Sequence, residues 1–293
     1  MKTSLFSFFL WLSFCWSLAA QDALYTLFDR SPILLNPALT GDIPDQQKHR
    51  IIYQHRAQWF DALRDERYEH FAVAYDQNIP LCSNQGASAI GIGLQAISEE
   101  IPYLSGSPNY KTNKLALDLA YRRTLGKRVY FAGGFEAEWL HHRLDTEGLQ
   151  FPSQYDGLGA FSSSTLSGEL LLNPDNSSAS AFSIGGGLVL TIDNIKLKNL
   201  KKTSGLLRIG SALHHLTRPN LSLVGNSEDQ EATRSIRWTT HFRWQFPISD
   251  HFSLTPHGMY TLQGRGVWQF IGGGDFYLGS SNIPRLIPGL GFR

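Results

Sequence analysis

The chain has 293 residues, of which 17% are charged, 12% are aromatic and 27 are glycine, and its formal net charge is +1 at pH 7. This length is ordinary for a single all-β barrel, and low charge with many aromatic residues is typical of a wall that faces lipid. Because no large field of one sign is present, we exclude nucleic acid as a partner.

The first twenty residues have the composition of a secretory signal peptide. A short basic start precedes an apolar run from Leu5 to Leu18 and a pair of alanines that ends at Ala20. The run is shorter than a membrane span, so we predict a signal peptide over residues 1–20, cleaved after Ala20. The alternative, a lipoprotein signal ending at Cys15, is disfavoured because Phe14 is bulky where a small residue is expected.

Residues 21–48 lack the periodicity of a regular element. Pro32 and Pro37 forbid a regular central strand or helix, and the residue before a proline, Asn36, is restricted to an extended conformation. We therefore expect an irregular N-terminal segment that precedes the first strand.

From Arg50 onward, stretches of about ten residues alternate between apolar and small or polar side chains, with the period of two that indicates strands. In the clearest of them, Leu115, Leu117, Leu119 and Tyr121 alternate with Lys114, Ala116, Asp118, Ala120 and Arg122. The expected strands are 50–59, 69–75, 87–97, 114–122, 129–140, 182–192, 206–213, 236–246, 252–262, 268–276 and 286–292.

After the signal, no apolar stretch approaches the length of a membrane helix, so membrane residence must depend on strands. We predict an all-β fold: a transmembrane antiparallel β-barrel over residues 49–293 in the cell outer membrane of a Gram-negative bacterium. The even strand number of such barrels suggests about 12–14 strands, with the missing ones in the weakly patterned regions 145–180 or 221–224. We expect the last strand to pair with the first.

Polar stretches at 98–113, 149–178 and 217–234 are interpreted as extracellular loops. Short links such as 247–250 and 263–266 are interpreted as turns, so one rim of the barrel carries long loops and the other is tight. Inside such a barrel, the irregular segment 21–48 can lie as a luminal plug.

The start of the chain carries a set of residues that we take as the candidate site: Asp22, Asn36, Pro37, Ala38, Gly41, Arg56, Gln58 and Trp59. With these residues, the chain resembles the PorP/SprF family of type IX secretion system membrane proteins. Ala57 and Ser31 stand where the family typically has asparagine. The near-terminal Phe292 also resembles the terminal aromatic signal of outer-membrane barrels.

The resemblance implies a barrel similar to the FadL class that works at the surface of a Bacteroidota-type bacterium. The implied partners are membrane lipid and either type IX secretion components or a secreted surface protein, in protein secretion, surface attachment or gliding motility.

No catalytic, cofactor or metal site is predicted. His141-His142 and His214-His215 suggest metal binding, but adjacent strand residues point to opposite faces, and no cluster of carboxylates or cysteines accompanies them. Glu136 and Glu138 share one face of a strand, as do Arg237 and Arg243. We interpret these charges as a polar lumen wall tied by Glu–Arg pairs.

We interpret the glycine runs 185–187 and 272–274 as places where strands bend or where a plug approaches the wall. The aromatic side chains of Trp238, Phe242, Trp244 and Trp268 are interpreted as girdle residues.

The sequence thus indicates a non-enzymatic outer-membrane barrel that anchors or helps export a secreted surface protein. Two alternatives remain: a FadL-like transporter or porin for small solutes, and a soluble β-sandwich adhesin. In a sandwich, the aromatic faces would meet inside the molecule.

Overall fold

The structure is a computed structural model that describes residues 28–43, 47–58, 68–81, 88–102, 108–145, 155, 178–195, 205–223, 232–249, 252–264, 266–278 and 289–292. The expected signal peptide, residues 1–20, lies outside these ranges. So do most of the region 145–180, where further strands were expected, and the expected loop at 149–178 apart from Tyr155.

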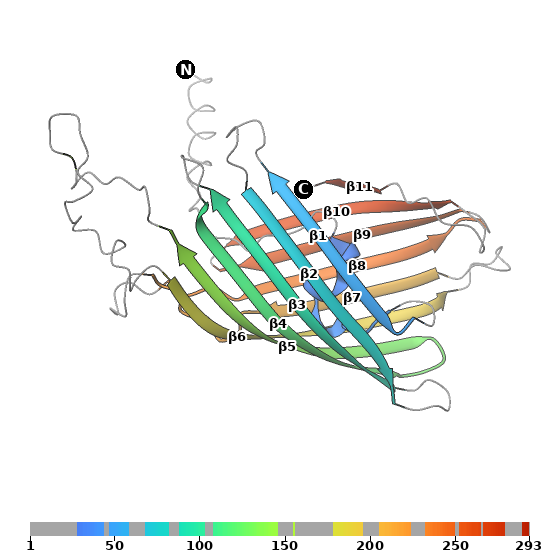
Figure 1. Ribbon diagram of the computed structural model, residues 1–293. Coiled ribbons are helices and arrows are strands. Elements are labelled where there is room, and N and C mark those ends of the chain that lie inside the picture. The colour runs from blue at the N-terminus through green and yellow to red at the C-terminus, as the bar shows by residue number, and fades with distance from the viewer. Residues whose placement is uncertain are drawn as a thin grey trace, which may run out of the picture.

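Eleven strands within the described ranges form one antiparallel sheet in which each strand pairs with the next along the chain (Figure 1). Their bounds are β1 His49–Gln58, β2 Tyr68–Pro80, β3 Ser88–Pro102, β4 Pro108–Thr124, β5 Val129–Leu144, β6 Ser178–Ile195, β7 Gly205–His214, β8 Arg237–Pro247, β9 Phe252–Gln263, β10 Val267–Leu278 and β11 Gly289–Phe292. Each strand expected from the alternation is present.

Most of the strands extend farther than the alternation indicated, whereas β11 (Gly289–Phe292) is shorter within the described residues. The stretch 98–113, expected as a loop, is mostly strand, because β3 continues to Pro102 and β4 begins at Pro108. Its polar character comes from charged residues opposite one another in the register, such as Glu100 and Lys111, which form an ion pair. Such a cross-strand ion pair stabilises the pairing of the two strands. It also interrupts the alternation of apolar residues by which the sequence indicates a strand.

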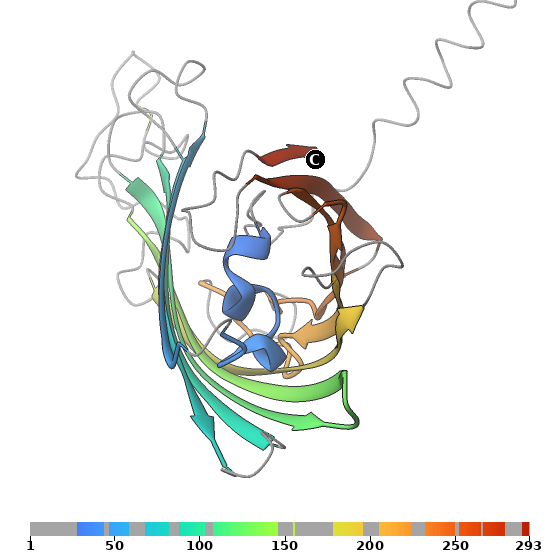
Figure 2. The same ribbon diagram turned by 90° about the vertical axis from the view of Figure 1, so that its right-hand side faces the viewer.

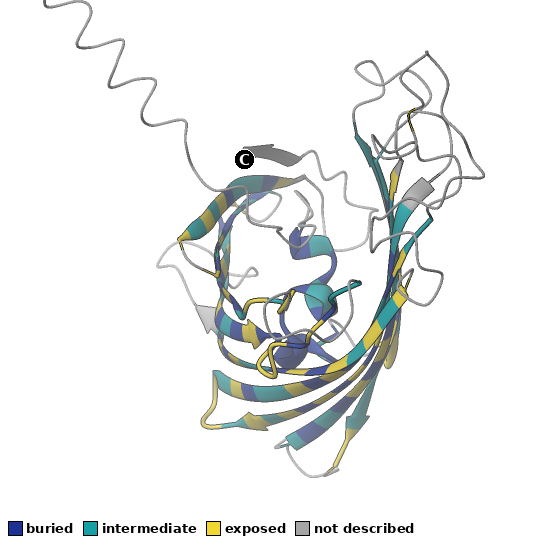
Figure 3. Ribbon diagram, turned by 90° about the vertical axis from the view of Figure 1, so that its left-hand side faces the viewer, coloured by how far each residue is buried: buried dark blue, intermediate teal, exposed yellow. Residues whose placement is uncertain are grey.

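The two faces of the sheet differ as a barrel wall requires. On β4, Leu117 is 62% exposed on the outer face, whereas its neighbour Asp118 is 3% exposed on the inner face. Trp238 and Phe242 of β8 are also exposed, and the inward Arg243 contacts an acidic residue inside the curve of the sheet. The banding of buried and exposed residues along the strands is visible in Figure 3. The arrangement confirms the predicted orientation and contradicts a sandwich with its aromatic residues inside.

The sheet curls into a barrel-like wall around an interior (Figure 2). The pairings run from β1 to β11 and leave these two strands at opposite edges of the sheet within the described residues. The expected pairing of the last strand with the first is therefore absent from the described residues, where β11 pairs with β10 over Gly272–Asp275.

Residues 28–43 lie inside this curve, where we call them the inner segment (Figure 2). It contains three single turns: η1 (Phe28–Arg30), α2 (Pro32–Leu35) and η2 (Pro37–Leu39). Its apolar side chains pack with small inward residues of the wall: Ile33 with Ala74, and Leu39 in one cluster with Ala132 and Val189. None of the helices in the described ranges has the length and apolar character needed to traverse a bilayer.

The two rims of the wall carry different links. One rim, called the long-link rim, carries the links 59–67, 103–107, 145–177, 215–236 and 264–266. The opposite rim carries 81–87, 125–128, 196–204, 248–251 and 279–288. The turn at 264–266 was expected at the tight rim. It joins β9 to β10 at the long-link rim instead, because successive strands are antiparallel and every second link therefore falls at the same rim.

Candidate functional site

The inner segment adopts short turns because its prolines stand where a turn begins. Pro32 and Pro37 are at the first positions of α2 and η2, where the missing N–H leaves no donor unsatisfied. Asn36, between the turns, has φ −157° and ψ 120°, the extended conformation predicted for a residue before proline. Its side chain accepts a hydrogen bond from the N–H of Ala38 at 2.9 Å and so caps η2.

The amide nitrogen of Asn36 fastens the inner segment to the wall. It donates to the carbonyl oxygens of Leu188 on β6 and Ser211 on β7, both at 3.2 Å. It also lies 3.1 Å from Nε2 of His241 on β8. Asn36 is fully buried, so each of these contacts replaces hydration that the amide has lost.

Glycines on the wall allow the inner segment to approach closely. A Cβ added at Gly187 would lie 2.0 Å from Oδ1 of Asn36, and one at Gly91 would lie 2.0 Å from the carbonyl oxygen of Thr40. At Gly134 a Cβ would lie 2.3 Å from the backbone of Pro37 and Ala38. At Gly187, the glycine run 185–187 thus lies where the inner segment comes close to the wall.

Gly41 has a different role, at a turn. Its φ is +70°, a backbone conformation that residues other than glycine rarely adopt. Its N–H donates to Oδ2 of Asp76 at 2.7 Å. Asp76 on β2 also receives two hydrogen bonds from Arg50 on β1, at 2.9 and 2.6 Å. Arg50 in turn donates to the carbonyl oxygens of Leu39 and Asp42. The end of the inner segment is thereby fastened to β1 and β2.

The carboxylate of Asp42 contacts arginine side chains from separate strands. Its carboxylate forms ion pairs with Arg122 of β4 at 2.7 Å and with Arg208 of β7. Burial favours the neutral acid, but Arg208, Arg122 and Arg50 outweigh it and hold the pKa of Asp42 below its ordinary value of 3.8. At neutral pH, Asp42 is thus an anion whose ion pairs tie the inner segment to β4 and β7.

The start of the inner segment has a second charge cluster. Asp29 pairs with Arg243 of β8 at 2.6 Å, and Arg30 pairs with Asp275 of β10 at 2.8 Å. Asp29, Asp275 and His257 bring three potential metal-ligand atoms within 4.8 Å of one another. Because guanidinium groups already neutralise both carboxylates, this donor set fits an ion-pair cluster better than a metal centre.

Part of the inner face of the sheet, which we call the charged wall, is built around two buried glutamates, Glu136 and Glu138. Glu136 and Glu138 of β5 are each 1% exposed and both contact the ammonium of Lys114, at 3.2 and 2.7 Å. Glu136 also contacts Nδ1 of His214 at 3.1 Å, and Glu138 contacts Nδ1 of His215 at 2.5 Å. The expected polar lumen wall is present, and these two glutamates contact the ammonium of Lys114 and the imidazole rings of His214 and His215.

The histidine pair His214-His215 also departs from expectation, since both rings reach inward. The strand β7 ends at His214, and His215 has φ 58°, which turns its side chain to the same side as its neighbour's. The pair His141-His142 follows the alternation: His141 contacts the exposed Ser180, and His142 is 8% exposed.

Gln95 of β3 links the charged wall to the inner segment. Its amide nitrogen lies 2.6 Å from Asp118, 3.1 Å from Glu136 and 3.3 Å from the carbonyl oxygen of Ile33. A displacement of the inner segment would therefore remove one acceptor from an amide that also bridges two buried carboxylates.

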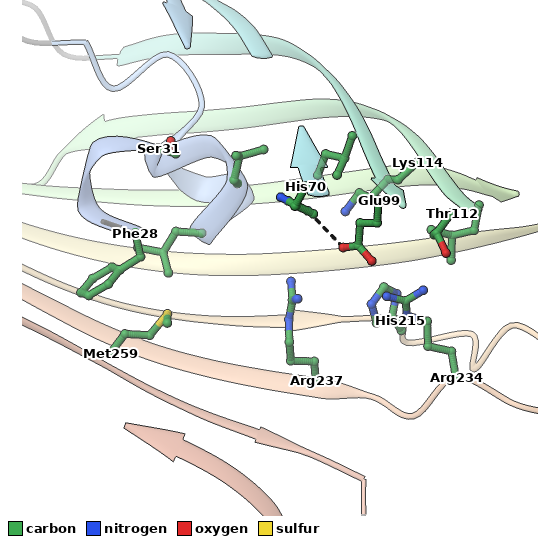
Figure 4. Close-up of a pocket in the computed structure, with 14 residues that line it drawn as sticks. Phe28, Ser31, His70, Glu99, Thr112, Lys114, His215, Arg234, Arg237 and Met259 are labelled. Atoms are coloured by element: carbon green, nitrogen blue, oxygen red, sulfur yellow. Dashed lines mark ion pairs between the residues drawn. The ribbon is translucent and has the colours of Figure 1, made fainter. Parts of the chain in front are cut away.

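A cavity lies between the inner segment and the long-link rim (Figure 4). Its floor is formed by Phe28, Ser31, Leu34 and Leu35, and its polar wall includes His70, Glu99, Thr112, Lys114, His215, Arg234 and Arg237. Its volume is about 70 Å³, room for on the order of five water molecules at 10–15 Å³ each. Within the described residues, the inner segment lies inside the curve of the wall, and a small, largely polar cavity lies between it and the long-link rim.

The candidate residues taken from the sequence divide into two groups. Asn36, Pro37, Ala38 and Gly41 are buried and contact the wall. Arg56 and Gln58 lie at the far end of β1, opposite His70 and Tyr68 of β2, and are half-buried. Asp22 and Trp59 lie outside the described residues.

The acidic and basic partners of the inner segment were missed by sequence reasoning. Asp29 and Asp42 of the segment itself were not identified, and neither were Arg50, Asp76, Arg122 and Arg208 on the wall. The only available signal was the inward position of Asp76, Arg122 and Arg208 in the alternation, which does not identify a partner.

Comparison with known proteins places these features in context. The sequence matches the family described as type IX secretion system membrane protein PorP/SprF over residues 17–269. No curated protein matches the chain. Among solved structures, it is similar to the translocator domain of the autotransporter NalP from Neisseria meningitidis, with 10% identity, a TM-score of 0.43 and coverage of 91% of this chain and 89% of that chain. It is also similar to the Ralstonia pickettii toluene transporter TbuX, with 16% identity, a TM-score of 0.45 and coverage of 90% and 81%.

Proposed function

Because this chain belongs to the PorP/SprF family of type IX secretion system membrane proteins, we propose that it anchors or helps export a secreted surface protein of the gliding or adhesin type. The family and the curled wall, apolar outside and polar inside, make it an outer-membrane protein. A signal peptide at residues 1–20 would deliver it there.

The observation that carries a scaffold role is the occupied interior. The inner segment is fastened to separate strands through Asp29, Asn36 and Asp42. A wall whose interior is occupied in this way supplies a rigid frame rather than an aqueous channel. We therefore propose that residues 21–48 act as a plug, with residues 49–293 forming the surrounding barrel.

The long-link rim is the proposed partner surface. The longest links, 145–177 and 215–236, leave the wall at this rim, and the cavity lies on the same side of the inner segment. Loops held by a rigid scaffold are where binding residues concentrate. We assign the chain no reaction, since Glu136 and Glu138, the carboxylate pair that shares one face of β5, are engaged by Lys114 in the wall.

The alternative, a transporter or porin for small solutes, requires a continuous path. A cavity of about 70 Å³ is far below the roughly 300–1,000 Å³ of a typical small-molecule site. Transport would require the inner segment to leave its contacts, whereas a scaffold requires it to stay.

The proposal is tested by affinity purification of the tagged protein from detergent-solubilised outer membranes after cross-linking of intact cells. We expect a type IX secretion component or a secreted surface protein to be recovered. Recovery of neither, with the barrel itself intact, would contradict the proposal. An unrelated tagged outer-membrane barrel serves as the control for detergent artefacts.

A further inference from the structure

The turn between β4 and β5 presents three cations to the surroundings. Arg123, near the end of β4, and Lys127 and Arg128, in the turn itself, are all exposed. None of them takes part in the ion pairs found among the described residues. One acid, Asp193 at the end of β6, lies beside the turn, because its N–H donates to the carbonyl oxygen of Arg128 at 2.8 Å. Even with Asp193 counted against them, the three cations leave the turn positive.

The sequences of the other links at this rim are also basic. The link 196–204, which joins the neighbouring strands β6 and β7, contains four lysines and no acid, and the link 279–288 contains Arg285. The single acid in the links of this rim is Asp250. In the links of the long-link rim, acidic residues outnumber basic ones. A chain of net charge +1 therefore concentrates its positive charge at one rim.

Arg123 stands on the lipid-facing side of the wall. On β4, Leu117, Leu119 and Tyr121 are exposed on the outer face, and Arg123 is the next outward position in the alternation. The neighbouring Arg122 points inward instead, where it pairs with Asp42. The two consecutive arginines thus have different environments, and Arg123 is the one that faces lipid.

The position of Arg123 along β4 corresponds to the boundary of the bilayer. It lies six residues beyond Leu117, which at about 3.3 Å per residue is about 20 Å along the strand. A strand tilt of about 40° leaves about 15 Å along the membrane normal, slightly more than half of an apolar band about 25 Å tall. Tyr121 and Phe131, the latter opposite Arg123 in the register, are exposed at this level, as girdle aromatics are.

The ligand chemistry follows from charge and position together. Short turns of outer-membrane barrels face the periplasm, so the turn 125–128 meets the periplasmic leaflet. A guanidinium binds phosphate through parallel N–H donors, and a lysine ammonium adds a point charge. An acidic protein surface would match the charge of the turn, but it would not explain a cation that projects among lipid-facing aromatics. The position of Arg123 therefore favours a lipid headgroup.

We propose that Arg123, Lys127 and Arg128 form a binding site for the phosphate of an anionic phospholipid in the periplasmic leaflet. Arg123 contacts the phosphate from the lipid-facing side of the wall, and Lys127 and Arg128 contact it from the turn. The site goes beyond the proposed function, because it needs no secreted partner. It would fix the height of the wall in the bilayer at this rim.

The test counts lipids bound to the purified full-length protein in a neutral detergent by native mass spectrometry. The protein is titrated with dioleoylphosphatidylglycerol, which is anionic, and with dioleoylphosphatidylcholine, which has the same acyl chains and no net charge. Soluble glycerol phosphate is added as a competitor that carries the phosphate without the chains. The variants are Arg123→Gln, Lys127→Gln and the triple variant that also contains Arg128→Gln. The matched control is Arg143→Gln, because Arg143 is an exposed arginine of β5 near the long-link rim.

We expect phosphatidylglycerol to bind more tightly than phosphatidylcholine and its binding to weaken as ionic strength rises. Each single variant should weaken phosphatidylglycerol binding about fivefold, the contribution of one basic residue at an anionic membrane surface. The triple variant should bind phosphatidylglycerol no better than phosphatidylcholine. The Arg143→Gln protein should bind as the wild type does, and glycerol phosphate should not compete at the concentration of the lipid.

Equal binding of the two lipids by the wild type would overturn the proposal, and it is the result expected if the rim instead docks an acidic protein. An equal loss in Arg143→Gln and Arg123→Gln would also overturn it, because binding would then depend on the number of cations and not on this turn. Effective competition by glycerol phosphate would contradict a lipid as the occupant. Heat-modifiable gel mobility verifies the fold of each variant.

Discussion

Gly187 on β6 lies directly beneath the side chain of Asn36, so closely that a Cβ at Gly187 would be 2.0 Å from Oδ1 of Asn36. Asn36 has no room to retreat, because its amide nitrogen is held by Leu188 and Ser211 at 3.2 Å each. The position of the inner segment therefore depends on the absence of a Cβ at Gly187 in the wall.

Gly187→Ala should displace the inner segment and lower the free energy of unfolding by about 1–3 kcal/mol, the usual cost of overpacking. The neighbouring Gly186→Ala is the control, because its Cβ would be 3.5 Å from the nearest atom, an ordinary contact. The measurement is the urea midpoint of the heat-modifiable gel shift in lipid vesicles. Equal midpoints for the two variants would show that the inner segment is not seated there.

Lys114→Met should remove a cation that contacts both Glu136 and Glu138. Breaking a buried ion pair leaves uncompensated charge, so we expect a loss of about 3–5 kcal/mol in unfolding free energy. Lys111→Met on the same strand is the control, since Lys111 pairs with Glu100 while 43% exposed and should cost at most about 1 kcal/mol. Denaturant titrations of both variants give the comparison, and similar losses would argue against a buried charged wall.

Asp42→Asn tests the charge cluster at the end of the inner segment and its pH dependence. The pKa of Asp42 is lowered below 3.8, because Arg208, Arg122 and Arg50 prevail over burial. A lowered folded-state pKa contributes stability above the unfolded value and loses it as the pH falls through the folded value. The variant should thus be about 2 kcal/mol less stable at pH 7.

The difference between the wild type and Asp42→Asn should shrink below about pH 4 and vanish once Asp42 is protonated in the folded protein. Unfolding midpoints measured from pH 7 down to pH 2 follow this course. A difference that does not change with pH would mean that the ionised carboxylate is not what stabilises the inner segment.

Two leucines of equal exposure test which surface faces lipid. Leu117, in the middle of β4, and Leu125, in the turn after it, are each 62% exposed. In a membrane, Leu117→Arg should cost about 2–4 kcal/mol near the bilayer midplane, and Leu125→Arg about 0–1 kcal/mol near the interface. Refolding into lipid vesicles measures both costs. In a soluble protein the two substitutions would be equally mild.

The sequence was sufficient to predict the strands, because alternation is a local property that survives in each segment. Leu117 and Asp118 are adjacent, and their opposite exposure follows from the period of two. The extended conformation of Asn36 was predictable for the same reason, since it depends only on Pro37.

The contacts of the inner segment were not predictable, because they join residues far apart along the chain. Asn36 and Ser211 are separated by 175 positions, and Asp29 and Arg243 by 214. The rule of opposite faces also failed at His215, where the strand ends and the backbone turns to φ 58°. Alternation gives the face of a residue but neither its partner nor the point where the strand stops.

A plugged scaffold requires an interior that the inner segment fills. Conductance of the full-length protein in planar bilayers tests this directly, with a known open porin reconstituted under the same conditions as the positive control. We predict no stable channel, because Asp29, Asn36 and Asp42 fasten the inner segment across the interior. A steady, ohmic conductance from the wild-type protein would contradict a plugged scaffold and favour a transporter.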